Sequence, residues 1–177
     1  MRRITHLTLG AAVTVPVVLD QPWPLAVGCL VLGGIGGGMP DWIDFQSGLR
    51  KPFTPRHRGA SHGLPVMAAS LLLLAIAILV IRDRIPEWPG EFDLFDGSGI
   101  WIALFAFGLG WLSHLASDAC TISGIQPLLP FARWRCWLMP RPLRSRSDGY
   151  LDKLVRLGAL TVLSFGLVLM TTRWWVG

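Results

Sequence analysis

The sequence predicts an all-α, polytopic membrane helix bundle with about five transmembrane helices and a short re-entrant or interfacial segment. Of the 177 residues, 52% are hydrophobic and only 15% are charged, and the mean hydropathy is +0.51. Soluble domains carry about 25% charged residues, so these values argue against a water-soluble globule and against a disordered chain. Because no linker rich in Gly and Ser divides the sequence, residues 1–177 are expected to form a single integral membrane domain.

Five apolar runs define the expected spans, because a spanning helix needs roughly 20 mostly apolar residues. The runs are residues 4–19, 21–40, 59–81, 97–113 and 157–172. The first run follows two arginines and also resembles a cleaved signal peptide, but no A-x-A cleavage site precedes Asp20. A retained span is therefore the preferred interpretation. Residues 119–132 are apolar but too short to cross a bilayer, and they are expected to form the re-entrant or interfacial segment.

The distribution of basic residues predicts the orientation. The N-terminus and the stretches 41–58 and 133–156 carry 13 of the 16 Lys and Arg residues. Cytoplasmic loops are enriched in Lys and Arg, so these parts are expected in the cytoplasm. The sequence thus predicts a multi-pass membrane protein with a cytoplasmic N-terminus, and the net charge of +5 is attributed to topology rather than to nucleic-acid binding.

On this topology all four histidines and three aspartates fall at one membrane face. These candidate metal ligands are His6, Asp41, Asp44, His57, His62, His114 and Asp118. His114 and Asp118 are four residues apart, so a helix places both on one face. Imidazole and carboxylate groups suit zinc first, with manganese or iron as alternatives. Seven ligands exceed the roughly three that a catalytic zinc takes from the protein, so we expect one or two divalent ions, bridged by Asp118 or Asp41.

Structural interpretations compete with the metal site. A lone histidine at a membrane end is commonly interfacial, which applies most to His6, and Asp41 after Pro40 is typical of a turn. Ionisable residues beside a span are costly and point to function, so the His114–Asp118 pair favours the metal site. Three hydroxyl residues have expected supporting roles: Ser61 as an N-cap of the third span, and Ser117 and Thr121 as groups that orient ligands.

Four stretches of the chain occur in an order that is similar to one protein family. They are His6 with Gly10, residues 40–44, residues 57–62 and residues 114–131. In these stretches the chain resembles the YdjM-like family of bacterial inner-membrane metal-dependent hydrolases. The resemblance implies a multi-span, metal-dependent hydrolase and does not define the substrate. This chain has Gly63 where the family often has Ser, and after residue 140 only Ser147 and Asp152 resemble a Ser–acid element of the family.

The sequence therefore predicts hydrolysis at the cytoplasmic membrane face. Bound metal would lower the pKa of a water molecule toward about 7 and stabilise a developing oxyanion. The candidate catalytic residues are Asp44, as proton acceptor, and Arg58, as phosphate ligand, although topology alone also explains Arg58. Residues 131–139 interleave Trp with Arg, which suits anionic lipid headgroups. The expected substrate is a phosphoester of a membrane lipid or lipid-linked molecule, and nucleic acid is not expected as a partner.

A metal-binding membrane protein without hydrolysis, for ion transport or sensing, is the alternative. A transporter would hold its ligands near the bilayer midplane, often at broken helices. The glycine-rich residues 33–38 could break the second span, but close helix packing by small residues is the preferred interpretation. Since the candidate ligands gather at one membrane face, the sequence favours an enzyme.

Overall fold

The computed structural model describes residues 1–50, 59–84, 97–146 and 149–176 and confirms the predicted helical bundle. The helices are α1 (Arg3–Val18), α2 (Trp23–Arg50), α3 (Leu64–Arg84), α4 (Gly97–Ala119) and α5 (Tyr150–Val176). Two short 3₁₀ turns are η1 (Ala60–His62) and η2 (Arg141–Leu143). Helices α2, α3, α4 and α5 are long and apolar enough to cross a membrane.

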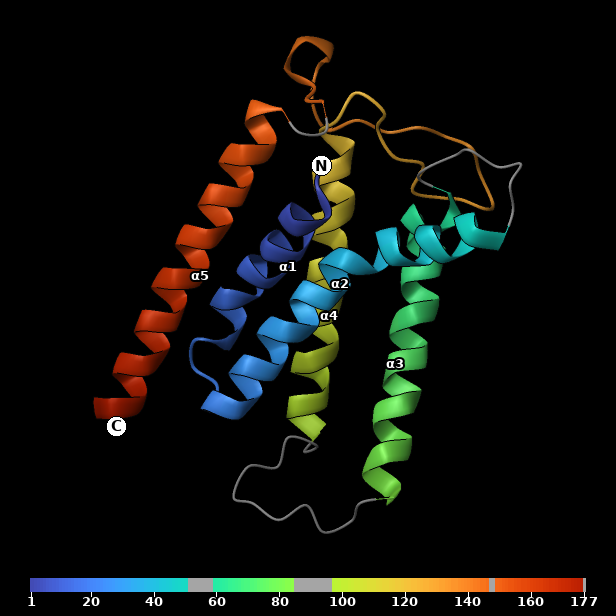
Figure 1. The fold of residues 1–177 in the computed structure, drawn as a ribbon. Coiled ribbons are helices and arrows are strands. Elements are labelled where there is room, and N and C mark those ends of the chain that lie inside the picture. The colour runs from blue at the N-terminus through green and yellow to red at the C-terminus, as the bar shows by residue number, and fades with distance from the viewer. Residues whose placement is uncertain (51–58, 85–96, 147–148, 177) are drawn as a thin grey trace.

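The first two helices differ from the expected spans. Helix α1 has 16 residues, and at 1.5 Å per residue it is about 24 Å long, short of the roughly 30 Å of a hydrocarbon core. The described residues thus hold four candidate spans and one shorter apolar helix. Helix α2 runs through Pro40 to Arg50, so Asp41 and Asp44 lie in a helix rather than in a turn. Figure 1 shows α2 changing direction in its second half, as expected for a helix that contains proline.

Helices α1, α2 and α4 form the centre of the bundle, with α5 against α1 and α3 against α4 (Figure 1). Glycines allow the central helices to approach closely. A Cβ atom added to Gly10 of α1 or to Gly110 of α4 would overlap the carbonyl oxygen of Gly33 on α2. The glycine-rich stretch therefore packs against both neighbours within a continuous helix, as the packing interpretation predicted.

Residues 120–146, which we call the arginine–tryptophan loop, connect α4 to α5 and run across one end of the bundle (Figure 1). The loop has little regular structure: η2 and two isolated β-bridges, Thr121 with Ser145 and Ile125 with Cys136. The loop lies at the end of the bundle where α4 ends and α5 begins (Figure 1), and the choice between an interfacial and a re-entrant segment stays a prediction. The start of α1, η1 and the last turn of α4 lie at the same end.

Candidate metal centre

The glycine contacts determine where the polar side chains meet. On each central helix a candidate ligand lies four residues, about one turn, from a glycine of the tight contact. The pairs are His6 and Gly10 on α1, Gly37 and Asp41 on α2, and Gly110 and His114 on α4. Residues four apart share a helix face, so the faces that pack closely also direct these ligands toward a common volume.

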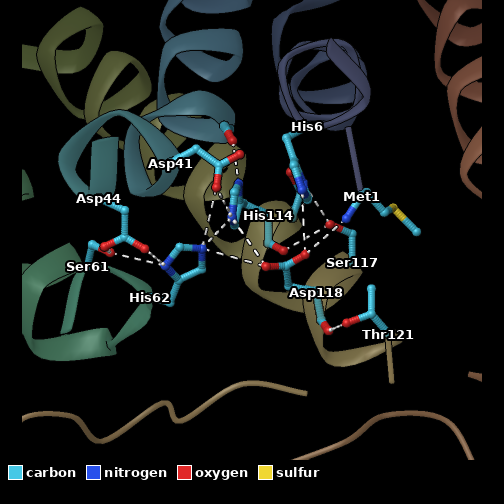
Figure 2. A network of polar contacts seen from close by, with 12 residues as sticks. Met1, His6, Asp41, Asp44, Ser61, His62, His114, Ser117, Asp118 and Thr121 are labelled. Atoms are coloured by element: carbon cyan, nitrogen blue, oxygen red, sulfur yellow. Dashed lines mark hydrogen bonds and ion pairs between the residues drawn. The ribbon is translucent and has the colours of Figure 1, made fainter. Parts of the chain in front are cut away.

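Three histidines turn their Nε2 atoms toward two carboxylates and toward one another (Figure 2). The Nε2 atoms of His62 and His114 are 3.0 Å apart. Asp118 Oδ1 lies 3.5 Å from His6 Nε2, and Asp118 Oδ2 lies 3.6 and 3.7 Å from the Nε2 atoms of His62 and His114. Asp41 Oδ1 lies 3.7 and 3.9 Å from the same two nitrogens.

All five side chains are buried. Their exposed fractions are 1% for His6, 1% for His62, 0% for His114, 6% for Asp41 and 2% for Asp118. Carboxylates are buried in proteins when a cation or hydrogen bonds compensate their charge. A buried pair of carboxylates facing three imidazole nitrogens is therefore suited to a positive charge at its centre.

In each ring the Nδ1 atom, which we call the outer nitrogen, points away from the converging Nε2 atoms. The outer nitrogens of His6 and His114 have hydrogen-bond partners that orient the rings. His114 Nδ1 donates to the Gly37 carbonyl oxygen at 2.7 Å, which leaves Nε2 of the neutral ring with its lone pair. The Ser117 hydroxyl donates to the His114 carbonyl at 2.9 Å, so it accepts a hydrogen from His6 Nδ1 at 3.0 Å. Such partners direct the opposite nitrogen toward a metal in many metalloproteins.

His62 is oriented by a carboxylate and a hydroxyl. Its Nδ1 lies 3.3 Å from Asp44 Oδ2 and 3.0 Å from the Ser61 hydroxyl, which itself donates to Asp44 Oδ1. The structure thus places Asp44 at the outer nitrogen of His62, away from the converging Nε2 atoms. Ser61 lies within η1 rather than at the start of α3, so its predicted role as an N-cap is wrong; its hydroxyl is committed to Asp44 instead.

The charge of His62 reflects these neighbours. Burial would lower its pKa, but hydrogen bonds to Asp41 and Asp44, with the charge of Asp118, outweigh burial and raise the pKa to about 9. Without a metal, a proton on His62 and the N-terminal ammonium group of Met1, which lies 3.5 Å from Asp118 Oδ1, offset part of the negative charge of the three carboxylates. A bound divalent ion would supply positive charge at the same place and would favour the neutral, ligating ring.

The donor atoms fit a divalent metal. Two groups have ligand atoms within 4.8 Å of one another: His6, His114 and Asp118, and Asp41, His62 and His114. Ligands of a tetrahedral zinc, at about 2.1 Å from the ion, lie roughly 3.4 Å apart. The six separations given above are 3.0–3.9 Å, and all ligand atoms within each group lie within 4.8 Å. An imidazole nitrogen has one lone pair, so His114 serves one ion only. Two ions would require a bridge, and the two oxygens of Asp118 face different histidines.

The remaining predicted residues contribute no converging ligand atom or lie outside the described part of the chain. His57, Arg58 and Ser147 are outside the described residues. The Thr121 hydroxyl donates to the backbone carbonyl of Asp118 at 2.7 Å, so it supports the end of α4. Asp152 accepts the Arg2 backbone N–H at 3.1 Å and thus holds the start of α1 against α5.

Two supporting contacts were absent from the sequence interpretation. The Gly37 carbonyl that orients His114 and the Ser61 hydroxyl that bonds Asp44 were not assigned these roles. The four-residue spacing of Gly33, Gly37 and Asp41 is the signal that could have indicated the first contact, because it places a bare backbone one turn from a candidate ligand.

Fold and site together define a helical integral membrane protein with a buried histidine–aspartate cluster at one end of its bundle. The chain belongs to the YdjM inner membrane protein family, whose family model matches residues 1–175. Neither a curated protein nor a solved structure matches the chain. Family membership and the four candidate spans identify a multi-pass protein of the inner membrane.

Proposed function

We propose that the protein is a metal-dependent hydrolase that acts, at the cytoplasmic face of the inner membrane, on a phosphoester of a lipid or lipid-linked molecule. The observation that carries the proposal is the convergence of three imidazole Nε2 atoms and two carboxylates in one buried cluster. Each of the three rings has a partner at its outer nitrogen, as metal-binding histidines commonly do.

Some residues would bind the metal, and others orient the side chains of these ligands. His6, His62, His114, Asp41 and Asp118 would bind one or two divalent ions, zinc first. His57 remains a further candidate ligand on sequence grounds. When bound, such an ion acidifies a coordinated water and stabilises negative charge on a reacting oxygen. Ser117, Asp44 and the Gly37 carbonyl keep the imidazole rings in their present orientation.

Asp44 is the proposed proton acceptor. Its carboxylate accepts hydrogen bonds from the Ser61 hydroxyl and from the Gly59 backbone N–H, at 3.4 Å for the latter, and it also faces His62. At the Nδ1 atom of a ligating histidine this carboxylate would hold the ring proton, and it would receive the proton of the attacking water through an intervening water molecule. Arg58 remains the proposed phosphate ligand, from the sequence alone.

The location of the cluster supports a lipid substrate. The cluster lies at one end of membrane-spanning helices, where the arginine–tryptophan loop crosses the bundle (Figure 1). A phosphoester bound there would have its polar part at the helix ends and any hydrocarbon chain alongside the helices. The same location supports an enzyme over a transporter, which commonly holds its ions near the bilayer midplane.

Release of phosphate from a short-chain phosphatidic acid in detergent micelles tests the hydrolysis. Wild-type protein stripped with a chelator should be inactive, and added Zn²⁺ or Mn²⁺ should restore turnover. His114→Ala should remain inactive with metal present, and Ser123→Ala, in the exposed part of the loop, should behave as wild type. Metal binding without turnover of any phosphoester would reject the hydrolase and leave the alternative of a non-hydrolytic metal-binding protein.

Cysteine labelling tests the cytoplasmic location. After replacement of Cys29, Cys120 and Cys136, single cysteines are introduced as Phe53→Cys and Glu91→Cys. A membrane-impermeant thiol reagent added to intact cells should label position 91 and not position 53, because basic loops stay in the cytoplasm. The reverse pattern would place the cluster at the outer face and reject this part of the proposal.

A further inference from the structure

The arginine–tryptophan loop has a defined internal structure. Ile125 and Cys136 exchange two backbone hydrogen bonds, of 3.1 and 2.8 Å. Gly124 has a φ of +63°, and a Cβ atom there would overlap the indole of Trp137. The loop therefore has a turn that requires glycine, and hydrogen bonds hold together the two segments on either side of it. Its exposed side chains are thus attached to an ordered backbone.

The loop is also attached to the element that carries His62. The Leu64 backbone N–H, at the start of α3, donates to the Pro127 carbonyl oxygen at 2.8 Å. A Cβ atom on Gly63 would overlap the Leu129 carbonyl oxygen, so the two backbones are in direct contact. The loop backbone therefore contacts the chain one and two residues after His62, a member of the histidine–aspartate cluster.

Large apolar side chains on the loop are exposed. The exposed fractions are 83% for Phe131, 61% for Trp134, 61% for Leu138 and 63% for Leu143. Several large exposed apolar side chains on one short ordered loop are typical of a binding surface. Arg133, Arg135, Arg141 and Arg146 are exposed among them, and residues 119–147 contain no Asp or Glu. The surface thus combines apolar groups with positive charge that no acidic residue of the same stretch offsets.

The fifth arginine of the loop has a different role. The Arg144 guanidinium lies 4.5 Å from the centre of the Trp137 ring, and its Nε donates to the Met139 carbonyl at 3.0 Å. The Trp137 indole N–H donates to the Ile122 carbonyl at 3.2 Å. Arg144 and Trp137 therefore brace the loop, and the charge available to a partner comes from the four exposed arginines.

We propose that the exposed side chains of the arginine–tryptophan loop form a binding surface for anionic phospholipid headgroups. Exposed arginines pair with the phosphates, and the aromatic and aliphatic side chains enter the boundary between headgroups and acyl chains. The mixture favours a lipid surface over nucleic acid, because Leu138 and Leu143 offer no ring on which bases stack. The proposal goes beyond hydrolysis: it concerns the affinity of the loop for lipid, whether or not the cluster is catalytic.

The test measures lipid preference in phosphatidylcholine nanodiscs that contain the full-length protein. Electron spin resonance compares the immobilised fractions of spin-labelled phosphatidylglycerol and phosphatidylcholine. The test variant is R133Q/R135Q, and R82Q/R84Q is its control. The control removes the same charge at the C-terminal end of α3, far from the loop, where Asp83 separates the two arginines. Near an anionic surface each arginine contributes roughly a fivefold factor. We expect wild type and R82Q/R84Q to prefer phosphatidylglycerol, and R133Q/R135Q to lose at least about fivefold of this preference.

Several outcomes would overturn the proposal. They are equal association of both lipids with wild type, the same loss in both variants, and a preference that persists undiminished at about 0.5 M NaCl, where exposed charges are screened. Single-stranded RNA is titrated in parallel; RNA binding that depends on Arg133 and Arg135, without lipid preference, assigns the surface to nucleic acid instead. If R133Q/R135Q lacks the wild-type circular dichroism spectrum, the single variant Arg141→Gln is measured under the same criteria.

Discussion

Helices α3 and α4 show that hydropathy and burial in the protein are separate properties in this molecule. The candidate span of α3 has a mean hydropathy of 2.9, yet none of its residues is buried. The span of α4 has a mean hydropathy of only 1.6, and 56% of the residues in its most apolar 18-residue stretch are buried. Lipid tails are as apolar as leucine, so leucine gains little by turning from lipid to protein. Glycine and polar residues, which lower the mean hydropathy, thus distinguish α4, one of the three central helices that carry the site, from the lipid-facing α3.

The largest expected effect of this contrast is on metal content. His114→Ala on α4 removes the nitrogen shared by both candidate ligand groups. We expect the divalent metal per protein chain, measured by inductively coupled plasma mass spectrometry, to fall at least about tenfold. Leu72→Ala on α3, where the side chain is exposed, is the control and should keep wild-type metal. Equal metal content in both variants would reject the site.

The second effect concerns two glycines of α4 that face different neighbours. A Cβ atom on Gly110 would overlap the Gly33 carbonyl oxygen, whereas one on Gly108 would meet only the Leu71 side chain, at 3.7 Å. Gly110→Ala must push α2 and α4 apart and should lower the free energy of unfolding by roughly 1–3 kcal/mol, as overpacking does. Gly108→Ala should change it by less than about 0.5 kcal/mol. Denaturation in detergent micelles measures both, and equal losses would contradict the close α2–α4 contact.

A third, smaller effect tests the orientation of His6. Ser117→Ala removes the hydroxyl that accepts a hydrogen from His6 Nδ1 and leaves every proposed ligand in place. Loss of such an orienting partner weakens metal binding about tenfold in other proteins. Competition with a fluorescent zinc chelator measures the affinity, and Ser70→Ala on α3 is the matched control. An affinity unchanged in Ser117→Ala would show that the hydroxyl does not orient a ligand.

Local spacing predicted much of the site, and tertiary packing decided the rest. The four-residue separation of His114 and Asp118 correctly indicated one helix face, because that relation depends on the helix alone. The two aspartates of α2 have different roles: Asp41 faces Nε2 of His62, and Asp44 faces Nδ1. This difference depends on where η1 contacts α2, so the spacing of the residues along the sequence cannot predict it. Hydropathy predicts the apolar runs but ends the second one at Pro40, because a proline inside a continuing helix has the same local signal as a stop.

The smallest expected effect is on the lipid-facing side of α3, and it tests the contrast most directly. Leu73 is 67% exposed in the protein, so its side chain contacts lipid in the bilayer. Leu73→Ala should change the free energy of unfolding by less than about 0.5 kcal/mol, because lipid fills the vacated space. Phe107→Ala on α4, where the side chain is 4% exposed, should cost roughly 3–5 kcal/mol because a cavity remains among packed helices. A large decrease in the free energy of unfolding for Leu73→Ala in the same denaturation assay would mean that α3 packs against protein in the folded state. Its high hydropathy would then not indicate a lipid-facing surface.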